Sequence, residues 1–402
     1  MKVLAGILCL VLSANLVADD WRQFRGNSSS GVSAEAGLPT KLDEKDTLRW
    51  KTDLPGRGLS GPIVIGNRVV LTASSGHTDD QLHILCFSAA TGEKLWARQF
   101  RATGRTICNG EMCMATPQPC SDGERIYAYY SCNDVICLDL DGNLVWYRGL
   151  GYDYPNASSS LGMASSPVVV SGTLVLQLDT DSESLATGLD ALTGETRWKA
   201  DRAKAGMWSS PAVYQPSSNV GAQVILQSTK SLQSIDPATG QEQWKVEEAC
   251  KEIPSTTVAG ELLVAPLKKL TVLRPGKTAD APEVLWSDAK LSPDTPTPIV
   301  YKDRVYVVKN SVLSSADLSS GKPAWKMRLK SGRGSSSPVA GDGHLYLVDE
   351  AGVFQAIQLG DARGEVASRL ELGEKIMATP ALSGGAIYLR SDKHLWKFAN
   401  AN

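Results

Sequence analysis

The sequence predicts an all-β protein, an eight-bladed propeller of four-stranded blades, and three observations lead to this prediction. A short phrase recurs along the chain: a strand ends near a small or acidic residue, a turn with a glycine follows, and a tryptophan comes four residues after that glycine. A small residue followed by proline recurs ahead of most copies. Between these markers, units contain three short apolar runs rich in β-branched residues. Such self-similarity, with four strands in about 40–50 residues, is typical of propeller blades.

Tryptophan marks seven of the units. The clearest copy is residues 189–198, LDALTGETRW, in which Gly194 stands where the turn needs a positive φ. A large ring at a fixed place in each hairpin predicts one aromatic plate per blade, wedged between neighbouring blades. The eighth copy has no tryptophan, and residues 365–370 hold its place. The predicted structural tryptophans are Trp50, Trp96, Trp146, Trp198, Trp244, Trp286 and Trp325.

The small residue before proline marks the opening of each blade. Seven openings have this form: Gly61-Pro62, Thr116-Pro117, Ser166-Pro167, Ser210-Pro211, Thr297-Pro298, Ser337-Pro338 and Thr379-Pro380. Residues 255–257, Ser-Thr-Thr, fill the remaining place without proline. The last unit, residues 378–398, has only three strands, and the N-terminal segment 48–54 supplies the fourth. We therefore expect one domain over residues 19–402, with the eighth blade split between about 46–54 and 376–399, because pairing the two ends removes exposed sheet edges.

Composition excludes several kinds of partner. The chain of 402 residues has 41 basic and 43 acidic side chains, a net charge of -2 without a basic excess, so no nucleic-acid partner is expected. Its 36 glycines and 20 prolines suit a turn-rich β protein. The apolar run near the N-terminus is too short to span a bilayer comfortably, and no other segment is apolar enough to do so. We expect a monomer.

Residues 1–18, MKVLAGILCLVLSANLVA, resemble a secretory signal peptide. One lysine precedes an apolar run over residues 3–12, and small residues surround a cleavage point near Ala18. The mature protein is then exported, either periplasmic or secreted. Cys9 leaves with the signal, and the odd number of cysteines that remains, seven, implies at least one free or intermolecular thiol in an oxidising compartment.

The repeats resemble those of the pyrroloquinoline quinone (PQQ) type propellers. The small-residue and proline opening, the strand ending at Leu189-Asp190, the Thr193-Gly194 turn and Trp198 carry the resemblance, which covers nearly the whole mature chain. Within that superfamily the chain is most similar to the exported non-enzymatic branch, which includes the BamB-type outer-membrane assembly propeller. The opening at residues 21–26, WRQFRG, is similar to that of many exported PQQ-like propellers.

The resemblance implies a non-catalytic scaffold that binds a protein or peptide in the cell envelope, with outer-membrane protein assembly as one such role. The quinone-dependent alcohol dehydrogenases of the superfamily share a vicinal Cys-Cys disulfide and Glu, Asn and Asp ligands to calcium. This sequence has no Cys-Cys pair, so we predict no catalytic residue, no metal site and no cofactor. The alternative is a periplasmic PQQ- or metal-dependent oxidoreductase, and a polysaccharide-binding module is a third hypothesis.

A candidate partner-binding face comes from two long inter-blade loops, 101–115 and 148–162, and from methionines at the blade entrances. Loops on rigid scaffolds often carry function, and Tyr with Asn suits recognition. The alternative interpretation is that the loops are simply solvated and that the methionines fill gaps between converging strands. The Met112-Cys113-Met114 triplet also suits Cu(I). The candidate residues are Arg105, Asn109, Glu111, Met112, Met114, Tyr152, Asp153, Tyr154, Met163, Met207 and Met377.

The cysteines and one acidic turn are further candidates. Cys108 and Cys113 share a loop and form a candidate disulfide, because a five-residue separation closes if the loop turns back. Cys86 and Cys137 occupy a register position that is small in other blades, which predicts buried thiols. Around Asp179, three acidic side chains alternate, which favours a solvated acidic turn over a calcium site.

Overall fold

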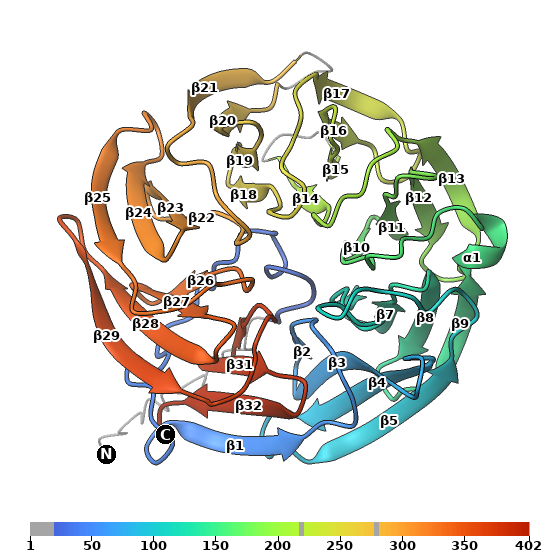
Figure 1. Cartoon of the computed structure of the whole chain (residues 1–402), viewed down its shortest axis with the longest axis horizontal. Coiled ribbons are helices and arrows are strands. Elements are labelled where there is room, and N and C mark those ends of the chain that lie inside the picture. Colours follow the sequence, from blue (N-terminus) through green and yellow to red (C-terminus); the bar gives the residue numbers. More distant parts are fainter. Residues whose placement is uncertain (1–19, 217–220, 277–280, 402) are drawn as a thin grey trace, which may run out of the picture.

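The chain forms a ring of eight four-stranded antiparallel sheets around a central channel (Figure 1). The structure is a computed structural model, and it describes residues 20–216, 221–276 and 281–401. Within these ranges the regular elements are β-strands and one short helix, α1 (Leu150–Asp153). The predicted eight-bladed all-β propeller is therefore confirmed. The predicted signal peptide, residues 1–18, lies outside the described residues.

Blades one to four follow the chain, each from its inner strand to its outer strand (Figure 1). They consist of β2 (Ile63–Ile65), β3 (Arg68–Ser75), β4 (Gln81–Ser88) and β5 (Lys94–Arg101); β6 (Cys120–Ser121), β7 (Arg125–Tyr129), β8 (Asp134–Asp139) and β9 (Leu144–Gly149); β10 (Val168–Val170), β11 (Thr173–Leu178), β12 (Leu185–Asp190) and β13 (Thr196–Asp201); and β14 (Ala212–Tyr214), β15 (Gln223–Gln227), β16 (Leu232–Ile235) and β17 (Glu242–Val246).

Blades five to eight complete the ring. They consist of β18 (Thr257–Ala259), β19 (Leu262–Pro266), β20 (Leu270–Arg274) and β21 (Glu283–Asp288); β22 (Ile299–Tyr301), β23 (Arg304–Lys309), β24 (Val312–Asp317) and β25 (Pro323–Arg328); β26 (Val339–Gly341), β27 (His344–Val348), β28 (Val353–Leu359) and β29 (Gly364–Glu371); and β30 (Ala381–Ser383), β31 (Ala386–Arg390), β32 (His394–Ala399) and β1 (Leu48–Asp53). The antiparallel pairing of β1 with β32 closes the ring, as the sequence predicts.

The repeated tryptophan and glycine meet between blades. The indole of Trp146 in blade two lies against Gly194 in the turn of blade three, where an added Cβ would lie 2.7 Å from the ring. Gly194 has a φ of +75°, so both its backbone and the neighbouring ring require glycine. The Trp146 Nε1–H also donates to Ala191 O of blade three at 3.1 Å. The same contact joins Trp50 to Gly92, Trp96 to Gly142, Trp198 to Gly240 and Trp286 to Gly321.

The residue at each blade opening faces the channel, and blade two departs from the predicted marker. β10 begins directly after Ser166-Pro167, whereas β6 begins directly after Gln118-Pro119. Gln118, two residues after the predicted Thr116, therefore occupies the opening position of blade two. The extra proline in this stretch explains the displacement, because both Thr116 and Gln118 precede a proline.

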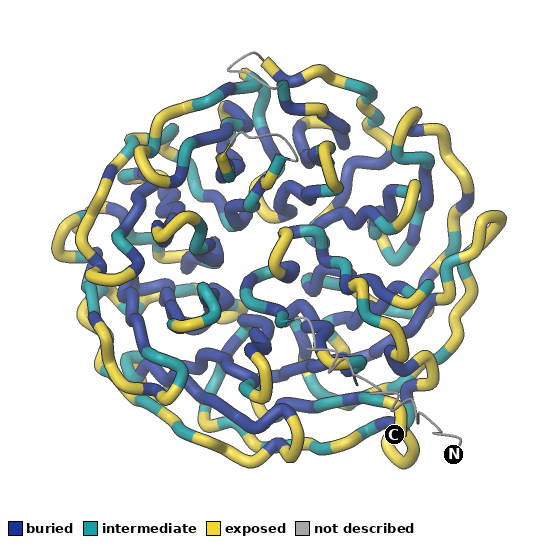
Figure 2. The backbone as a smooth tube through the Cα atoms, turned by 180° about the vertical axis from the view of Figure 1, so that it is seen from behind, coloured by how far each residue is buried: buried dark blue, intermediate teal, exposed yellow. Residues whose placement is uncertain are grey.

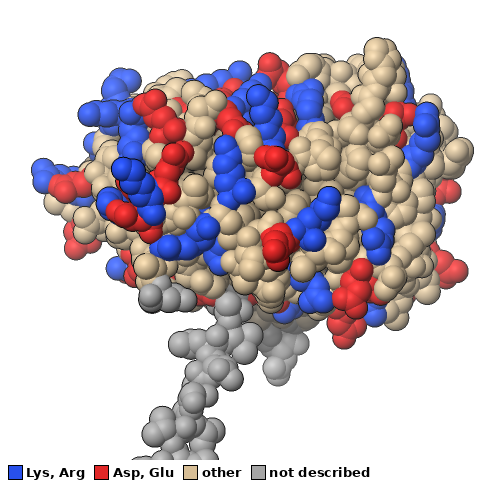
Figure 3. All heavy atoms as spheres, turned by 90° about the horizontal axis from the view of Figure 1, so that it is seen from below, with Lys and Arg blue, Asp and Glu red and all other residues tan. Residues whose placement is uncertain are grey.

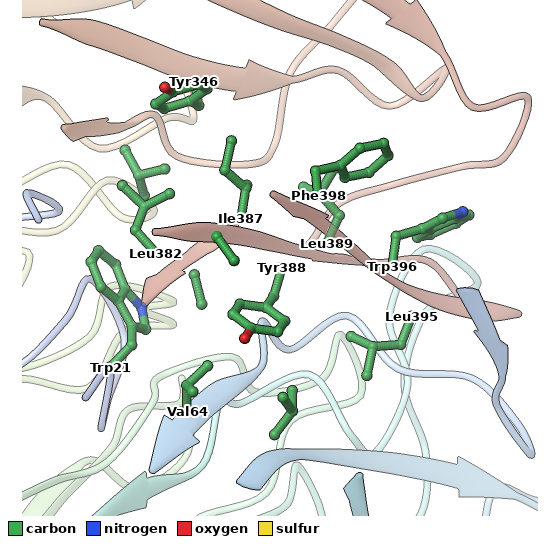
Figure 4. Packing of buried hydrophobic residues seen from close by; sticks show 14 of the residues in the cluster. Trp21, Val64, Tyr346, Leu382, Ile387, Tyr388, Leu389, Leu395, Trp396 and Phe398 are labelled. Atoms are coloured by element: carbon green, nitrogen blue, oxygen red, sulfur yellow. The ribbon is translucent and has the colours of Figure 1, made fainter. Parts of the chain in front are cut away.

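The segment before β1 crosses the channel, and we call residues 21–33 the channel strap (Figure 1). Trp21 forms an antiparallel bridge with Val64 of β2, and Val32 forms a parallel bridge with Ala340 of β26. The strap therefore adds to the channel-facing edges of the inner strands of blades one and seven, which lie on either side of blade eight. Figure 4 shows the Trp21 indole among Val64 and the side chains of blade eight, in the largest apolar cluster.

Burial follows the radius of the ring. Residues of the inner and middle strands are mostly buried, whereas exposed residues concentrate in loops and along the outer strands (Figure 2). Lys and Arg alternate with Asp and Glu over the side of the ring in Figure 3, which agrees with the near-zero net charge. In the described part of the chain, helices with the length and apolar character to cross a bilayer are absent.

Candidate functional site

A pocket of about 400 Å³ occupies one mouth of the channel, and we call it the mouth pocket. The opening residues of all eight blades line it: Gly61, Gln118, Ser166, Ser210, Ser255, Thr297, Ser337 and Thr379. Phe24 of the channel strap also lines it. The strap residues Asn27, Ser28, Ser30 and Val32 instead line a groove beside the hairpin turns at the other end of the inner strands. The strap therefore enters from the far face, and Phe24 forms the floor of the mouth pocket.

A belt of hydrogen bonds runs around the wall of this pocket. The backbone N–H of Ser210 donates to Ser255 Oγ at 2.9 Å, and the N–H of Ser255 donates to Thr297 Oγ1 at 3.0 Å. Four further bonds of the same kind connect Gln118 to Ser166, Ser166 to Ser210, Thr297 to Ser337 and Ser337 to Thr379. Each hydroxyl uses a lone pair to accept, so its own O–H remains a donor.

Two buried guanidinium groups flank the pocket. Arg25, directly after Phe24, donates to Pro298 O at 2.9 Å and to Pro338 O at 3.2 Å, just below the opening residues of blades six and seven. Arg390 donates to Ser60 Oγ at 3.3 Å, and Ser60 lines the pocket. Burial lowers the pKa of Arg25 to about 9 and that of Arg390 to about 10, so both remain protonated at neutral pH.

No carboxylate of the described residues forms an ion pair with either guanidinium. Arg25 also donates to Ser30 O and Thr257 Oγ1, so its partners are carbonyls and a hydroxyl. Arg390 donates to carbonyls and to Ser60, and its Nη2 has no partner within the described ranges. An uncompensated buried cation is costly, and here two stand beside one cavity.

The rim of the mouth pocket is apolar, with charges at its edge. Leu161 and Ile253 are 47% and 43% exposed, unusual for large apolar side chains, and both line the pocket. Trp208 lines it between them, and its Nε1–H donates to Gly162 O at 3.0 Å, which fixes the ring. Glu111 of the lining pairs with Lys375 across the rim.

The predicted partner-binding residues fall into four groups. Asn109, Glu111, Met112 and Met377 line the mouth pocket. Three others, Arg105, Tyr152 and Tyr154, line a second cavity of about 220 Å³ between the two long loops. Asp153 pairs with Arg148 at 2.6 Å at the surface.

Met114, Met163 and Met207 do not lie at an accessible surface. All three are buried in apolar clusters between blades, so they fill gaps between inner strands, the alternative interpretation of the sequence. Met112 and Met114 separate because their segment is a loop and not a strand, so the expected alternation does not apply. The pocket residues Phe24, Leu161, Trp208 and Ile253 were not predicted. The sequence could have indicated Trp208, because this tryptophan lies outside the repeated phrase.

The candidate disulfide between Cys108 and Cys113 is not formed. Both cysteines are free, and Cys113 is buried with its Sγ 3.8 Å from Thr116 Oγ1. Cys86 and Cys137 are buried thiols as predicted, and burial raises the pKa of each to about 12. Each lies opposite the tryptophan of its own blade, where the ring leaves room for a small side chain only.

The acidic turn is solvated only in part: Asp181 is exposed as predicted and Glu183 is partly exposed, whereas Asp179 is not solvated. Asp179 is buried, and Arg202 reaches across from the next connection to donate to it at 2.9 and 3.1 Å. Burial raises the pKa of Asp179, although Arg202 opposes that shift. Arg202 also donates to Gln227 O of β15, so the ion pair connects blades three and four.

The fold and the repeated docking of tryptophan on glycine define the class of protein, an eight-bladed PQQ-like propeller. The sequence matches the family described as outer membrane protein assembly factor BamB over residues 28–245, 180–312, 228–363 and 309–402. The chain therefore belongs to this family. No curated protein matches the sequence.

Solved structures of BamB and of alcohol dehydrogenases share the fold. BamB from Moraxella catarrhalis superposes with a TM-score of 0.63 at 15% identity, over 87% of this chain and 98% of that one. A europium-containing methanol dehydrogenase gives 0.69 at 12% identity, over 95% and 98%. Quinohemoprotein alcohol dehydrogenase from Comamonas testosteroni gives 0.68 at 13% identity, over 95% and 80%. At these identities the likeness concerns the fold alone.

The mouth pocket does not fit a calcium-bound quinone. Glu111 is the one carboxylate among its described lining residues, and Lys375 pairs with it. Calcium takes about six to eight oxygen ligands, usually with several carboxylates. Across the described ranges, no group of three or more His, Cys, Asp or Glu side chains is placed to hold a metal ion.

Proposed function

We propose that this protein is an exported, non-catalytic scaffold that binds a protein or peptide partner through the face that carries the mouth pocket. The observation that carries the proposal is the pocket itself, a hollow of about 400 Å³ with exposed Leu161 and Ile253 at its rim. Large apolar side chains around a concavity are typical of interaction sites.

The construction of the ring supports this role. The hydrogen-bonded belt and the tryptophan contacts hold neighbouring blades in fixed positions, so the mouth is preformed and little order is lost on binding. The long loops 101–115 and 148–162 border the pocket and add Asn109, Glu111 and Leu161 to its lining. Membership of the BamB family favours a partner in the cell envelope, with outer-membrane protein assembly as the specific role.

Export is part of the proposal. The signal-like residues 1–18 are the observation that motivates it. N-terminal sequencing of the protein from its native host should begin at residue 19. Retention of Met1 on the protein would remove the export step from the proposal.

Paired charge substitutions test the binding face. The double variant Leu161→Glu with Ile253→Glu introduces two carboxylates at the rim, and we expect it to lose the partner that co-purifies with the wild type from cross-linked native envelopes. The matched control is Leu95→Glu with Val366→Glu, because those residues are 49% and 38% exposed on outer strands. Equal recovery of the partner with both double variants would contradict the proposal.

The oxidoreductase alternative requires a different result. The protein is purified from its own envelope and then given PQQ and calcium. A bound chromophore, a stoichiometric metal or oxidation of an alcohol would contradict the scaffold and indicate an enzyme. A colourless protein without that activity supports the scaffold.

A further inference from the structure

We propose that the mouth pocket binds a carboxylate, and that its source is the C-terminal end of an extended, apolar partner chain. The inference rests on the proposed function and names the chemistry that the same pocket recognises. Three independent features carry it: the pocket is closed at its floor, its wall presents hydroxyl donors, and two buried cations stand beside it without a carboxylate partner.

The closed floor decides how a chain can enter. The strap places Phe24 across the channel, and Arg25 below it is bound to the carbonyls of blades six and seven. A polypeptide therefore cannot thread through the channel. A pocket of this size, about 400 Å³, holds a chain end or a single large side chain.

The hydroxyl wall decides the polarity of the ligand. Ser166, Ser210, Ser255, Thr297, Ser337 and Thr379 all line the pocket and are at least nine-tenths buried. Each accepts a backbone N–H from the neighbouring opening residue, so each has an O–H to donate. Gln118 can add its side-chain amide, which now donates to Pro62 O. A ring of donors requires a ligand that accepts, and a carboxylate accepts at about four lone-pair sites.

The charge distribution decides the sign. Arg25 and Arg390 are buried, and their hydrogen bonds go to carbonyls and hydroxyls. Ser60 connects one of them to the pocket, since its Oγ accepts from Arg390 and its residue lines the cavity. On the rim, Lys375 pairs with Glu111 and Arg333 pairs with Glu350, so the excess positive charge comes from the two buried guanidinium groups. An anion entering the pocket therefore meets a positive field in a low-dielectric wall.

The apolar rim decides what precedes the carboxylate. Leu161, Trp208 and Ile253 line one side of the opening, on three successive inter-blade connections, so the last residues of the ligand should bear apolar side chains. A chain end of this kind supplies both halves of the site, with the carboxylate on the hydroxyl ring and the side chains on the rim.

Two peptides that differ in one group test the inference. The probe is a fluorescein-labelled hexapeptide, Gly-Ser-Gly-Ala-Val-Phe, with a free carboxylate, and its twin carries a C-terminal amide. We expect the mature wild-type protein to bind the acid at least tenfold more tightly than the amide in fluorescence anisotropy titrations. The preference should weaken with added salt, because part of it is electrostatic.

Variants of one belt residue locate the site. Ser210→Ala removes one donor and should reduce the preference for the acid at least threefold, whereas Ser210→Thr keeps the hydroxyl and should retain it. Ser209→Ala is the matched control, because Ser209 is buried next to Ser210 but does not line the pocket. Thermal unfolding of each variant separates loss of binding from loss of folding.

The outcomes distinguish failure of the carboxylate inference from failure of the proposed scaffold function. Equal affinity for acid and amide would overturn the carboxylate site and leave the peptide scaffold standing. Binding of free phenylacetate, measured by isothermal titration calorimetry, without binding of either peptide would keep the carboxylate site but overturn a chain end as its source. Absence of binding by all three probes would overturn the inference, while the partner co-purification test would still decide the proposed function.

Discussion

The contact between tryptophan and turn glycine leads to a quantitative prediction, because Gly194 and Gly343 form a natural pair. Their φ angles are +75° and +76°, so alanine is disfavoured by a similar backbone strain at both, about 1–2 kcal/mol. An added Cβ at Gly343 meets nothing within 4 Å, whereas at Gly194 it would lie 2.7 Å from the Trp146 ring. Displacing a packed indole adds about 1–3 kcal/mol. Gly194→Ala should therefore destabilise the protein by about 2–5 kcal/mol, and Gly343→Ala by about 1–2 kcal/mol.

A double-mutant cycle measures this coupling directly. The free energies of unfolding come from urea denaturation followed by circular dichroism for the wild type, each single variant, Trp146→Ala and the double variant. In the Trp146→Ala background the ring is gone, so Gly194→Ala should cost no more than Gly343→Ala does. An equal cost for Gly194→Ala with and without Trp146 would refute the view that the ring selects the glycine.

Three further predictions concern buried and titrating groups. Arg202→Met leaves the buried Asp179 carboxylate without its partner and should lower the free energy of unfolding by about 3–5 kcal/mol at pH 7; a loss below about 1 kcal/mol in urea denaturation would contradict a buried ion pair. Hydrogen bonds from Arg197 and then from the turn backbone lower the pKa of Asp190 to about 2, from 3.8. The resulting stability is present above about pH 4 and is lost as the pH falls through about 2. Asp190→Asn should therefore make the unfolding midpoint less sensitive to acid over that window. An unchanged pH profile would contradict a contribution of Asp190 to stability. Cys108 is the least buried described thiol, so iodoacetamide at pH 8.5 should label the native protein there first, as peptide mass spectrometry would reveal; equal labelling of Cys108 and Cys113 would contradict their different burial.

The blades could be predicted because their determinants are local and repeated. Gly194 and Trp198 lie within one hairpin, and the repetition of that spacing revealed the unit, its number of strands and the split eighth blade. The small residue at each blade opening could also be recognised in the sequence, but its role in the hydrogen-bonded belt could not. The belt connects residues of successive blades about 40 positions apart, such as Ser255 and Thr297.

The channel strap could not be predicted, since its contacts carry no local pattern. Arg25 binds Pro338, which lies 313 residues later, and only closure of the ring brings the two together. The floor of the mouth pocket depends on this contact, so Phe24 escaped prediction as well. The methionines illustrate the opposite error: residue type alone did not separate Met112 at the mouth from Met163 in the core, because burial depends on loop geometry.

The most direct test of the central claim, that the mouth face binds the partner, is a photocrosslinking scan in the native envelope. A photoreactive amino acid replaces one exposed apolar residue at a time, at Leu161 and Ile253 on the rim and at Leu95 and Val284 on outer strands. The proposal predicts that the two rim positions capture the same partner and that the two outer positions do not. Capture from the outer strands alone would contradict a binding site at the mouth of the channel.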